Sequence, residues 1–278
     1  MSTPITAAMV NELRQRTGLP MMECKAALTH VGGDMDKAID HIRVTVKGAG
    51  VKRAGNETAE GRVAVAVDGG VGAIVELRCE SAPVAKNDLF VAYANQVAAA
   101  VAKHNPATVE ALMATEIAPG KTAADGLTDL IGVLRENMKI HRFQRVTGDL
   151  FGSYVHHDGT LGVLVVGSGS GDPEILRNVS MHVAAVQPTP VATKQSEVPA
   201  EVVTKELEIA KAKAEATGKP AQIAQKIAEG QMKTWYAENV LVEQPFVMDQ
   251  ATTVGALLKG ANLDVTKFVR YKVGEIVK

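Results

Sequence analysis

The sequence predicts an α+β protein in which a small helical bundle precedes a core of two similar halves. Three observations support this fold class: helical periodicity in the first fifty residues, strand periodicity from about residue 61, and a return of that strand pattern further along the chain. The 278 residues are enough for two domains of ordinary size. The predicted parts are a bundle over residues 1–46, a linker over 47–60, and core halves over 61–148 and 149–278.

Three short helices are predicted before the linker, because each is bounded by its own start or stop signal. Thr6 can cap the first helix, and Gly18 can end it in the left-handed conformation. Pro20 suits the first turn of the second helix, and the turn at 32–34 separates it from the third. The stretch over 47–60 has several glycines and no apolar stripe, which is typical of a linker. The apolar residues expected inside the bundle are Met9, Val10, Leu13, Cys24, Ala27, Leu28, Val31, Ala38, Ile39 and Ile42.

A β-hairpin followed by a helix is predicted after the linker. Valines at 63, 65 and 67 alternate with other residues until Asp68-Gly69-Gly70, and a return strand runs from Val71 to Cys79. The next segment has helical spacing, so the unit is a hairpin and then a helix. The residues expected on the inner face of this helix are Phe90, Ala94, Val97 and Val101.

The same unit occurs again in the second half of the chain. The turn and strand pattern of residues 68–75 matches that of residues 158–165 position for position, an offset of 90. A helix containing residues 182–186 follows this second hairpin. A third strand is predicted at the end of each half, over 137–145 and over 262–270. The sequence therefore predicts a duplicated core.

The second half is longer, and the added residues predict an inserted helical hairpin at about 195–237. The third strands are offset by 125 residues (262 minus 137), which is 35 more than the hairpins. Prolines exclude helix at the start of the insertion, and Gly218-Lys219-Pro220 predicts the turn between two antiparallel helices. Such a pair packs on its own body or on another chain, so a homodimer through the hairpin stays open. The residues expected between its helices are Val203, Leu207, Ala210, Ala214, Ile223, Ile227 and Met232.

The composition argues against several classes of protein. Thirty Lys and Arg oppose 31 Asp and Glu, a balance that supplies no general field to attract nucleic acid. The first residues lack the pattern of an export signal, and no apolar run approaches the ~18 residues needed to cross a membrane. Only two cysteines occur, and their spacing is not that of paired metal ligands. We therefore expect a cytoplasmic protein with no membrane segment and no nucleic acid as main ligand.

The motifs that could carry chemistry have simpler interpretations. Gly120-Lys121-Thr122 lacks the leading glycine of a phosphate-binding loop, and the glycine-rich residues 167–172 suit a strand-to-helix turn. His156-His157-Asp158 cannot all face one metal ion if neighbouring side chains alternate in direction. Cys79 is a poor nucleophile, because the adjacent Glu80 raises the pKa of a thiol. We predict a binding protein without a cofactor, not an enzyme.

Several segments resemble bacterial elongation factor Ts, and they occur in order along essentially the whole chain. Residues 13–18 and 21–28 are similar to the amino-terminal signature of that family, and Cys-Glu-Ser-Ala-Pro-Val-Ala-Lys-Asn at 79–87 occupies the position of its second signature. The resemblance implies a three-helix domain like ubiquitin-associated domains, a duplicated core and a helical-hairpin insertion. Further matches lie at residues 152–156, 181–185 and 244–248.

The resemblance implies a guanine-nucleotide exchange factor for the translational GTPase elongation factor Tu, in its GDP-bound and nucleotide-free forms. The amino-terminal helices of the family bind the nucleotide-binding domain of the GTPase, and Arg14, Met21 and Met22 match contact positions there. His156 matches a residue that contacts the far side of the partner. The tip of the second signature disturbs the magnesium and phosphate site, and its positions are matched by Ser81, Ala82, Pro83 and Val84.

This chain departs from the family pattern at that tip. The usual residues are Thr-Asp-Phe-Val, so Ala82 and Pro83 replace a carboxylate and an aromatic ring. Because a buried aromatic ring contributes strongly to many interfaces, exchange is expected to be weaker unless Pro83 acts as a smaller, stiffer wedge. The alternative is a chaperone that binds and stabilises the GTPase without exchanging its nucleotide. The carboxy-terminal helical module of many relatives is also not expected before Lys278.

Overall fold

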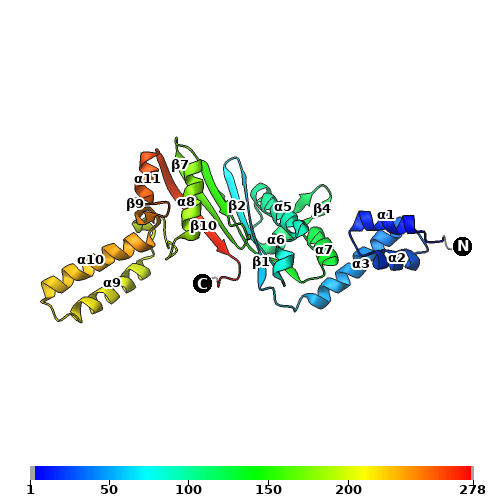
Figure 1. Ribbon diagram of the computed structural model, residues 1–278, viewed down its shortest axis with the longest axis horizontal. Helices are drawn as coiled ribbons and strands as arrows, with labels where there is room; N and C mark the ends of the chain where they lie inside the picture. The colour runs from blue at the N-terminus through cyan, green and yellow to red at the C-terminus, as the bar shows by residue number, and fades with distance from the viewer. Residues whose placement is uncertain (1–3, 277–278) are drawn as a thin grey trace.

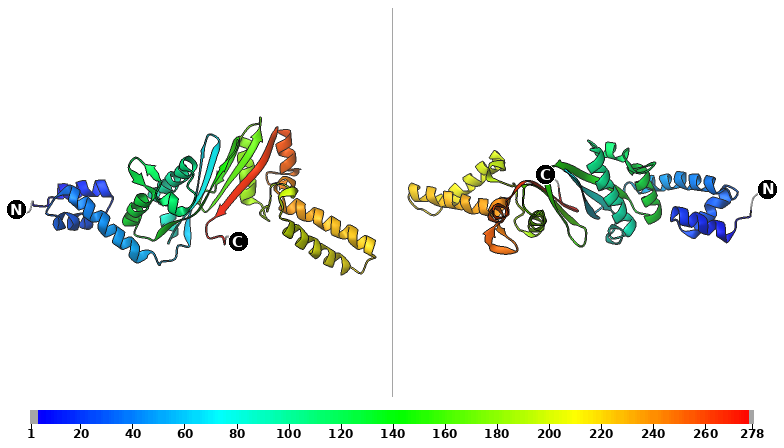
Figure 2. Two further views of the ribbon diagram at one scale, coloured as in Figure 1. Left: turned by 180° about the vertical axis from the view of Figure 1, so that it is seen from behind. Right: turned by 90° about the horizontal axis from the view of Figure 1, so that it is seen from above.

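The computed structural model describes residues 4–276, and it shows an elongated molecule. The N-terminal helical bundle lies at one end, a layered α/β core lies in the middle, and a helical hairpin projects from the other end (Figure 1). The views from behind and from above agree on this order (Figure 2). Among the described residues, no helix is both long and apolar enough to cross a lipid bilayer.

The bundle consists of α1 (Ala7–Thr17), α2 (Met21–His30) and α3 (Met35–Arg53). The Thr6 side chain accepts the N–H of Met9, and Gly18 ends α1 at a φ of 70°, so both predicted boundary signals are confirmed. The apolar stripes predicted from helical spacing meet in one small core. Its fully enclosed residues are Val10, Leu13, Leu19, Cys24, Ala27, Leu28 and Ala38.

The structure corrects the predicted start of the linker. Helix α3 continues to Arg53, so residues 47–53 are helical and the non-helical connection to the core covers only 54–59. A glycine inside a helix costs roughly 1 kcal/mol relative to alanine. The free-energy cost of the glycines at 48 and 50 is too small to end a helix that is anchored in the bundle at its other end.

The first core half is an antiparallel sheet with helices on one face. Its strands are β1 (Glu60–Asp68), β2 (Val71–Cys79) and β5 (Met138–Thr147), in the spatial order β1-β2-β5. Helix α5 (Asp88–His104) covers the outer face, and the predicted inner residues of that helix are all buried. The hairpin, the helix and the third strand of this half are therefore confirmed.

The second half repeats this topology. Its strands are β6 (Leu150–Val155), β7 (Leu161–Gly169) and β10 (Leu263–Lys272), in the order β10-β7-β6, and α8 (Glu174–Ala185) covers the outer face. In both halves the return strand of the hairpin is central and the late third strand pairs beside it. The duplication predicted from the repeat is present in the sheet topology.

Each half also contains a small hairpin and a helix that the sequence analysis did not find. Thr122 caps one of these helices and Thr253 caps the other, so the repeat is longer than the strand pattern indicated. Gly120-Lys121-Thr122 is thus a turn and a helix cap. In the first half the elements are α6 (Val109–Met113), β3 (Glu116–Ala118), β4 (Lys121–Thr122) and α7 (Ala123–Leu134). In the second they are η2 (Leu241–Glu243), β8 (Pro245–Phe246), β9 (Asp249–Thr253) and α11 (Val254–Gly260).

The insertion is an antiparallel pair, α9 (Ala200–Glu215) and α10 (Ala221–Asn239), preceded by the short η1 (Gln195–Glu197). One predicted inward residue is wrong: Ile223 is 46% exposed, and Ala224 is buried in its place. Small side chains let the two helices approach closely, so alanines form most of the seam. The buried seam residues are Ala210, Ala214, Ala224, Ala228 and Met232. The homodimer through this hairpin stays a prediction.

The two sheets pack face to face, and this contact joins the halves. Side chains from both sheets form one enclosed apolar layer, so the core has the order helix, sheet, sheet, helix. Glycine permits the close approach, because a Cβ atom at Gly72 would lie 2.9 Å from the Leu164 side chain and from the Phe151 ring. The buried residues of this layer are Val63, Ile74, Val146, Leu164, Val166, Val269 and Tyr271.

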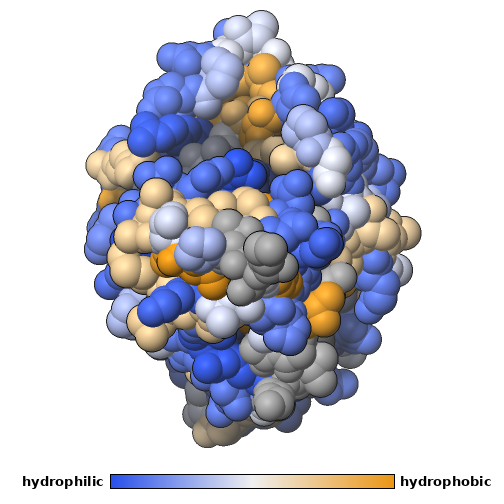
Figure 3. Space-filling model, turned by 90° about the vertical axis from the view of Figure 1, so that its right-hand side faces the viewer, coloured by the Kyte–Doolittle hydropathy of each residue, from blue (hydrophilic) through white to orange (hydrophobic). Residues whose placement is uncertain are grey.

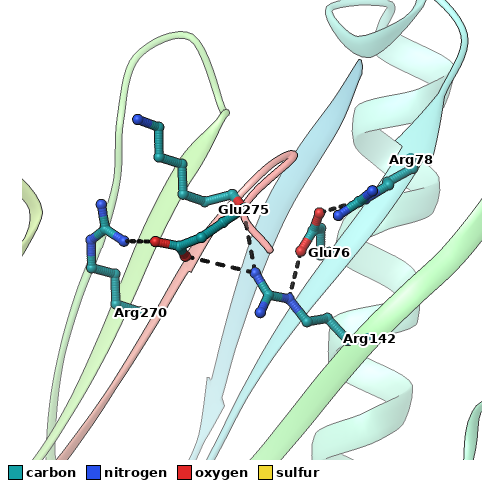
Figure 4. A network of polar contacts seen from close by, with 6 residues as sticks. Glu76, Arg78, Arg142, Arg270 and Glu275 are labelled. Atoms are coloured by element: carbon teal, nitrogen blue, oxygen red, sulfur yellow. Dashed lines mark hydrogen bonds and ion pairs between the residues drawn. The ribbon is translucent and has the colours of Figure 1, made fainter. Parts of the chain in front are cut away.

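A polar network closes one edge of the inter-sheet space (Figure 4). Glu76 of β2 is fully buried, and its two carboxylate oxygens accept the Nε–H groups of Arg78 at 2.7 Å and Arg142 at 2.6 Å. The Arg142 guanidinium also lies 4.1 Å above the ring of Tyr271, which belongs to the other sheet. The buried charge is therefore compensated, and one of its partners contacts both halves.

We expect the Gly152→Ala substitution to destabilise the core by about 3 kcal/mol, because the added methyl group would overlap the backbone of Leu176 and Arg177 in α8. Gly230→Ala is the matched control: no atom lies within 4 Å of the added Cβ in α10, so stability should rise by roughly 0.5–1 kcal/mol. Thermal unfolding followed by circular dichroism measures both. Equal stability of the two variants would contradict the packing described for β6 and α8.

Candidate functional site

The segment that follows β2 forms a small exposed tip, defined here as residues 81–84. Ser81 has an extended backbone and begins the one-turn helix α4 (Ala82–Ala85), in which Pro83 occupies the first turn, where no backbone donor is required. Ala82 and Pro83 are exposed, whereas Val84 is half-buried and packs on the core of the first half. The part of the tip that a partner can touch is therefore small and apolar.

Two carboxylates hold the tip from below. One Glu136 carboxylate oxygen accepts the backbone N–H groups of Glu80 at 3.1 Å and Ser81 at 3.0 Å, and the other accepts the Ser81 hydroxyl. The Glu80 carboxylate accepts the N–H of Asn137 and the side-chain amide of Asn56. The Asn137 N–H, followed by the Asn56 amide, lowers the pKa of Glu80, so this group is ionised at neutral pH.

Cys79 lies buried directly beneath the tip. Its thiol is 3.3 Å from the Ser81 carbonyl oxygen. Burial, and after it the charge of Glu136, raises the pKa of Cys79 to about 12. The sequence analysis attributed the effect to Glu80, which contributes less than burial and Glu136. Because the thiolate is the reactive form, Cys79 is not a nucleophile in this environment.

The bundle exposes the three residues that the sequence analysis selected. Met21 and Met22 begin α2 and are 49% and 72% exposed, and Arg14 on α1 is exposed as well. Seen from the bundle side, the surface is mainly polar with small apolar patches (Figure 3). Exposed methionines are adaptable contact residues because their side chains are unbranched and polarisable.

The bundle is attached to the first core half through α7 and the turn after it. Val133 of α7 packs against the bundle core, close to Gly18 at the end of α1. Arg135, in the turn, forms an ion pair with Glu23 of α2. Arg14, Met21 and Met22 are thus held at a defined place relative to the tip, although they do not lie next to it.

His156 lies at the edge of an apolar groove on the second half. Its Nδ1 atom is 2.8 Å from the Tyr154 hydroxyl, and the ring is half-buried. The groove has a volume of about 400 Å³ and also includes Met181, Val247 and Met248. Val247 and Met248 are 41% and 52% exposed, so this groove presents apolar surface beside a polar ring.

The residues 156–158 do not form a metal site in the described part of the chain, where no group of three or more His, Cys, Asp or Glu side chains has a suitable arrangement. The Asp158 carboxylate instead accepts the backbone N–H and the hydroxyl of Thr160 at 2.9 and 3.0 Å. It therefore stabilises its own turn.

A fully buried histidine fixes the loop that carries Val247. The N–H of Val247 donates to Nδ1 of His182 at 3.1 Å, so Nε2 carries the proton and donates to the Gln244 side-chain oxygen at 3.0 Å. The Gln244 amide in turn donates to the carbonyl oxygens of Pro188 and Glu238. Burial lowers the pKa of His182, so the neutral ring is the stable form.

The strand registers bring the tip and the His156 turn to the same end of the sheets. Cys79, just before the tip, pairs with Glu60 at the start of β1. Val63 of β1 donates its N–H to the carbonyl oxygen of Gly159 at 2.8 Å. Gly159 lies in the turn after His156, between β6 and β7. The connection from the bundle enters at this end as well (Figure 1). Sequence segments about 75 residues apart (156 minus 81) therefore share one end of the core.

Comparison with known proteins identifies this arrangement. Residues 80–275 match the family model described as Elongation factor TS. The elongation factors Ts of Ralstonia nicotianae and Cupriavidus taiwanensis are 46% and 47% identical to this chain, over 98% of the chain and 91% of each relative. That of Methylococcus capsulatus is 44% identical over 98% of the chain and 92% of the relative.

These matches place the chain among the translation elongation factors. It belongs to the elongation factor Ts family, whose known role is nucleotide exchange and not the catalysis of a chemical reaction. The duplicated core, the N-terminal helices and the inserted hairpin are consistent with that family.

We expect the stability of this protein to fall as pH decreases below about 6.5, the ordinary pKa of histidine. The folded state holds His182 neutral, so the unfolded state binds more protons in this range and is favoured by acid. The His182→Gln variant should be less stable at pH 7.5 and should lose less stability between pH 7.5 and 5.5. Urea unfolding at the two pH values measures this. A residual slope should persist, because the pKa of His141 is also lowered; an unchanged slope would contradict the neutral assignment.

Proposed function

We propose that this protein promotes the release of GDP from elongation factor Tu by inserting the tip, Ser81 to Val84, beside the magnesium and phosphate site of the GTPase. The bundle, through Arg14, Met21 and Met22, would bind the nucleotide-binding domain, and His156 would contact the far side of the partner. Because elongation is a cytoplasmic process, we place the exchange in the cytoplasm. The observation that carries the proposal is the identity of 46% and 47% to two elongation factors Ts over 98% of the chain.

The properties of the tip support a mechanical role. Its exposed residues, Ala82 and Pro83, have no ionisable group, so they can act only by occupying space. Pro83 has a restricted backbone, and the tip is hydrogen-bonded to the Glu136 carboxylate. A small side chain displaces a neighbouring group only if its own backbone stays in place. Pro83 and the hydrogen bond to Glu136 restrict the motion of the tip backbone in this way.

Linkage explains how contact alone gives exchange. A factor that weakens nucleotide binding must be weakened equally by the nucleotide, and a coupling of about 1–3 kcal/mol corresponds to roughly 5- to 150-fold in affinity. GTP can then displace the factor just as the factor displaces GDP. No bond needs to be made or broken by this protein.

The direct test is the release of labelled GDP from the cognate elongation factor Tu. We expect micromolar factor to accelerate release about fivefold or more, because a weakened affinity for GDP would appear mainly as faster dissociation. A factor that captures the GTPase in a pull-down but leaves the release rate unchanged would be the non-exchanging chaperone, and this result would exclude the exchange role.

The tip residues are tested by restoring the usual pair. We expect the double substitution Ala82→Asp and Pro83→Phe to raise the release rate at saturating factor about tenfold, since a buried aromatic ring contributes on the order of 1–2 kcal/mol beyond the present side chains. Ala216→Asp, in the turn of the inserted hairpin, is a control for added negative charge. Equal rates for the wild type and the double variant would show that the tip does not reach the nucleotide site.

The bundle contact is tested by truncating one methionine. We expect Met22→Ala to raise the concentration of factor needed for half-maximal release about fivefold to thirtyfold, because an exposed anchor residue contributes of the order of 1–2 kcal/mol at an interface. Thermal stability should not change, since Met22 is 72% exposed. Val44→Ala, at an equally exposed residue of α3, is the matched control. An effect of Val44→Ala as large as that of Met22→Ala would contradict a specific contact.

A further inference from the structure

The turn after α7 holds three parts of the molecule together through three consecutive residues, 135–137. Arg135 bonds to Glu23 in the bundle, Glu136 bonds to the tip, and Asn137 bonds to the connection between the bundle and the core. The three contacts join segments that are 55 to 112 residues apart in the sequence. We call residues 135–137 the junction turn.

The backbone of the junction turn is held in an unusual conformation. Arg135 has a φ of 62°, in the left-handed region that non-glycine residues avoid at a cost of roughly 1–2 kcal/mol. Its N–H bonds to the Ile131 carbonyl and ends α7. This conformation places the next two residues beneath the tip, so the local cost is offset by their contacts.

Glu136 binds the first residue of the tip and the residue just before it. Its carboxylate accepts two backbone N–H groups and one hydroxyl, all from Glu80 and Ser81. Hydrogen bonds to an ionised acceptor are stronger than neutral ones. Without this carboxylate, the two N–H groups would need other acceptors. The tip would then keep its covalent ends, the packing of Val84 and the weak contact between the Cys79 thiol and the Ser81 carbonyl.

Asn137 adds contacts to Glu80, just before the tip, and to the connection between the bundle and the core. Its N–H donates to the Glu80 carboxylate, and its side-chain amide donates to the carbonyl oxygen of Asn56 at 2.7 Å. Glu80 and Glu136 therefore cross: each carboxylate binds the backbone of the segment that carries the other. A crossed pair of this kind resists both translation and rotation of the tip.

We propose that Glu136 is a positioning residue for nucleotide exchange, because it fixes the tip at a set distance from the bundle without touching the partner itself. This inference rests on the proposed role of the tip. A misplacement of about 1 Å can cost as much as 100-fold in rate when geometry determines the effect. With Ala82 and Pro83 in place of a larger wedge, the tip has little reach to compensate for such a displacement.

The experiment measures GDP release from elongation factor Tu as a function of factor concentration. We expect Glu136→Ala to lower the release rate at saturation at least tenfold, and to change the half-saturating concentration less than threefold because the bundle contacts remain. Glu136→Gln should recover the rate to within about threefold of the wild type, since an amide oxygen still accepts a backbone N–H. Glu116→Ala is the matched control, because that carboxylate accepts the N–H of Gly120 at 2.6 Å away from the tip.

A second measurement separates this inference from the proposed function. Hydrogen exchange of the Glu80 and Ser81 amides should be faster in Glu136→Ala than in the wild type, and unchanged in Glu116→Ala. If the wild-type factor does not accelerate release, the proposed function is refuted, regardless of the hydrogen-exchange rates of the two amides. If the wild-type factor accelerates release and Glu136→Ala reaches a rate within twofold of the wild type, the positioning role is overturned.

Folding of the variants is checked by thermal unfolding. If Glu136→Ala does not fold, Ser81→Ala decides, because it removes only the hydroxyl that Glu136 accepts. A lower saturating rate in Ser81→Ala, with an unchanged half-saturating concentration, supports the inference. A saturating rate in Ser81→Ala equal to that of the wild type overturns it.

Discussion

The face-to-face packing of the two sheets determines where every other part of this protein lies. Each sheet has a helix-covered face and a second apolar face, and the second faces can be buried only against each other. Glycines at the contact let the strands approach closely, as at Gly72 and Gly162. The bundle and the hairpin lie at opposite ends of the molecule, on either side of this joined core.

The polar edge of this contact specifies its alignment. Glu76 lies opposite Arg142 in the β2–β5 ladder, at the last pair before a register shift between Glu76 and Leu77. Glu275 follows β10, and its carboxylate pairs with Arg270 at 2.9 Å and lies 4.0 Å from Arg142 of the other half. A buried ion pair adds little net stability compared with apolar packing. We attribute its value here to alignment, since a slip of one sheet over the other would move Arg142 away from Tyr271 and Glu275 of the second half.

Local signals predicted most of the fold. Caps, glycine stops and long periodic segments identified the bundle, both sheets and the insertion, and the repeat located the duplication. The strands β3 and β4 were missed because strands of two or three residues contain no measurable period. Ile223 was placed wrongly because hydrophobicity favours isoleucine over the adjacent Ala224, whereas close helix packing favours the smaller residue. The resemblance selected the tip, but its support by Glu136 is a contact across 55 residues, which no periodicity predicts.

Under the proposed function, the mounting of the tip explains how a reduced wedge would act. The energy for distorting the GTPase would come from binding elsewhere, chiefly at the bundle, and would be transmitted through the protein to the tip. A flexible tip would move aside on contact, and the binding energy would not distort the GTPase. The junction turn links the bundle directly to the tip, since Arg135 bonds to the bundle and the next residue bonds to Ser81. Stiffness along this route can therefore substitute for the size of the side chain at the tip.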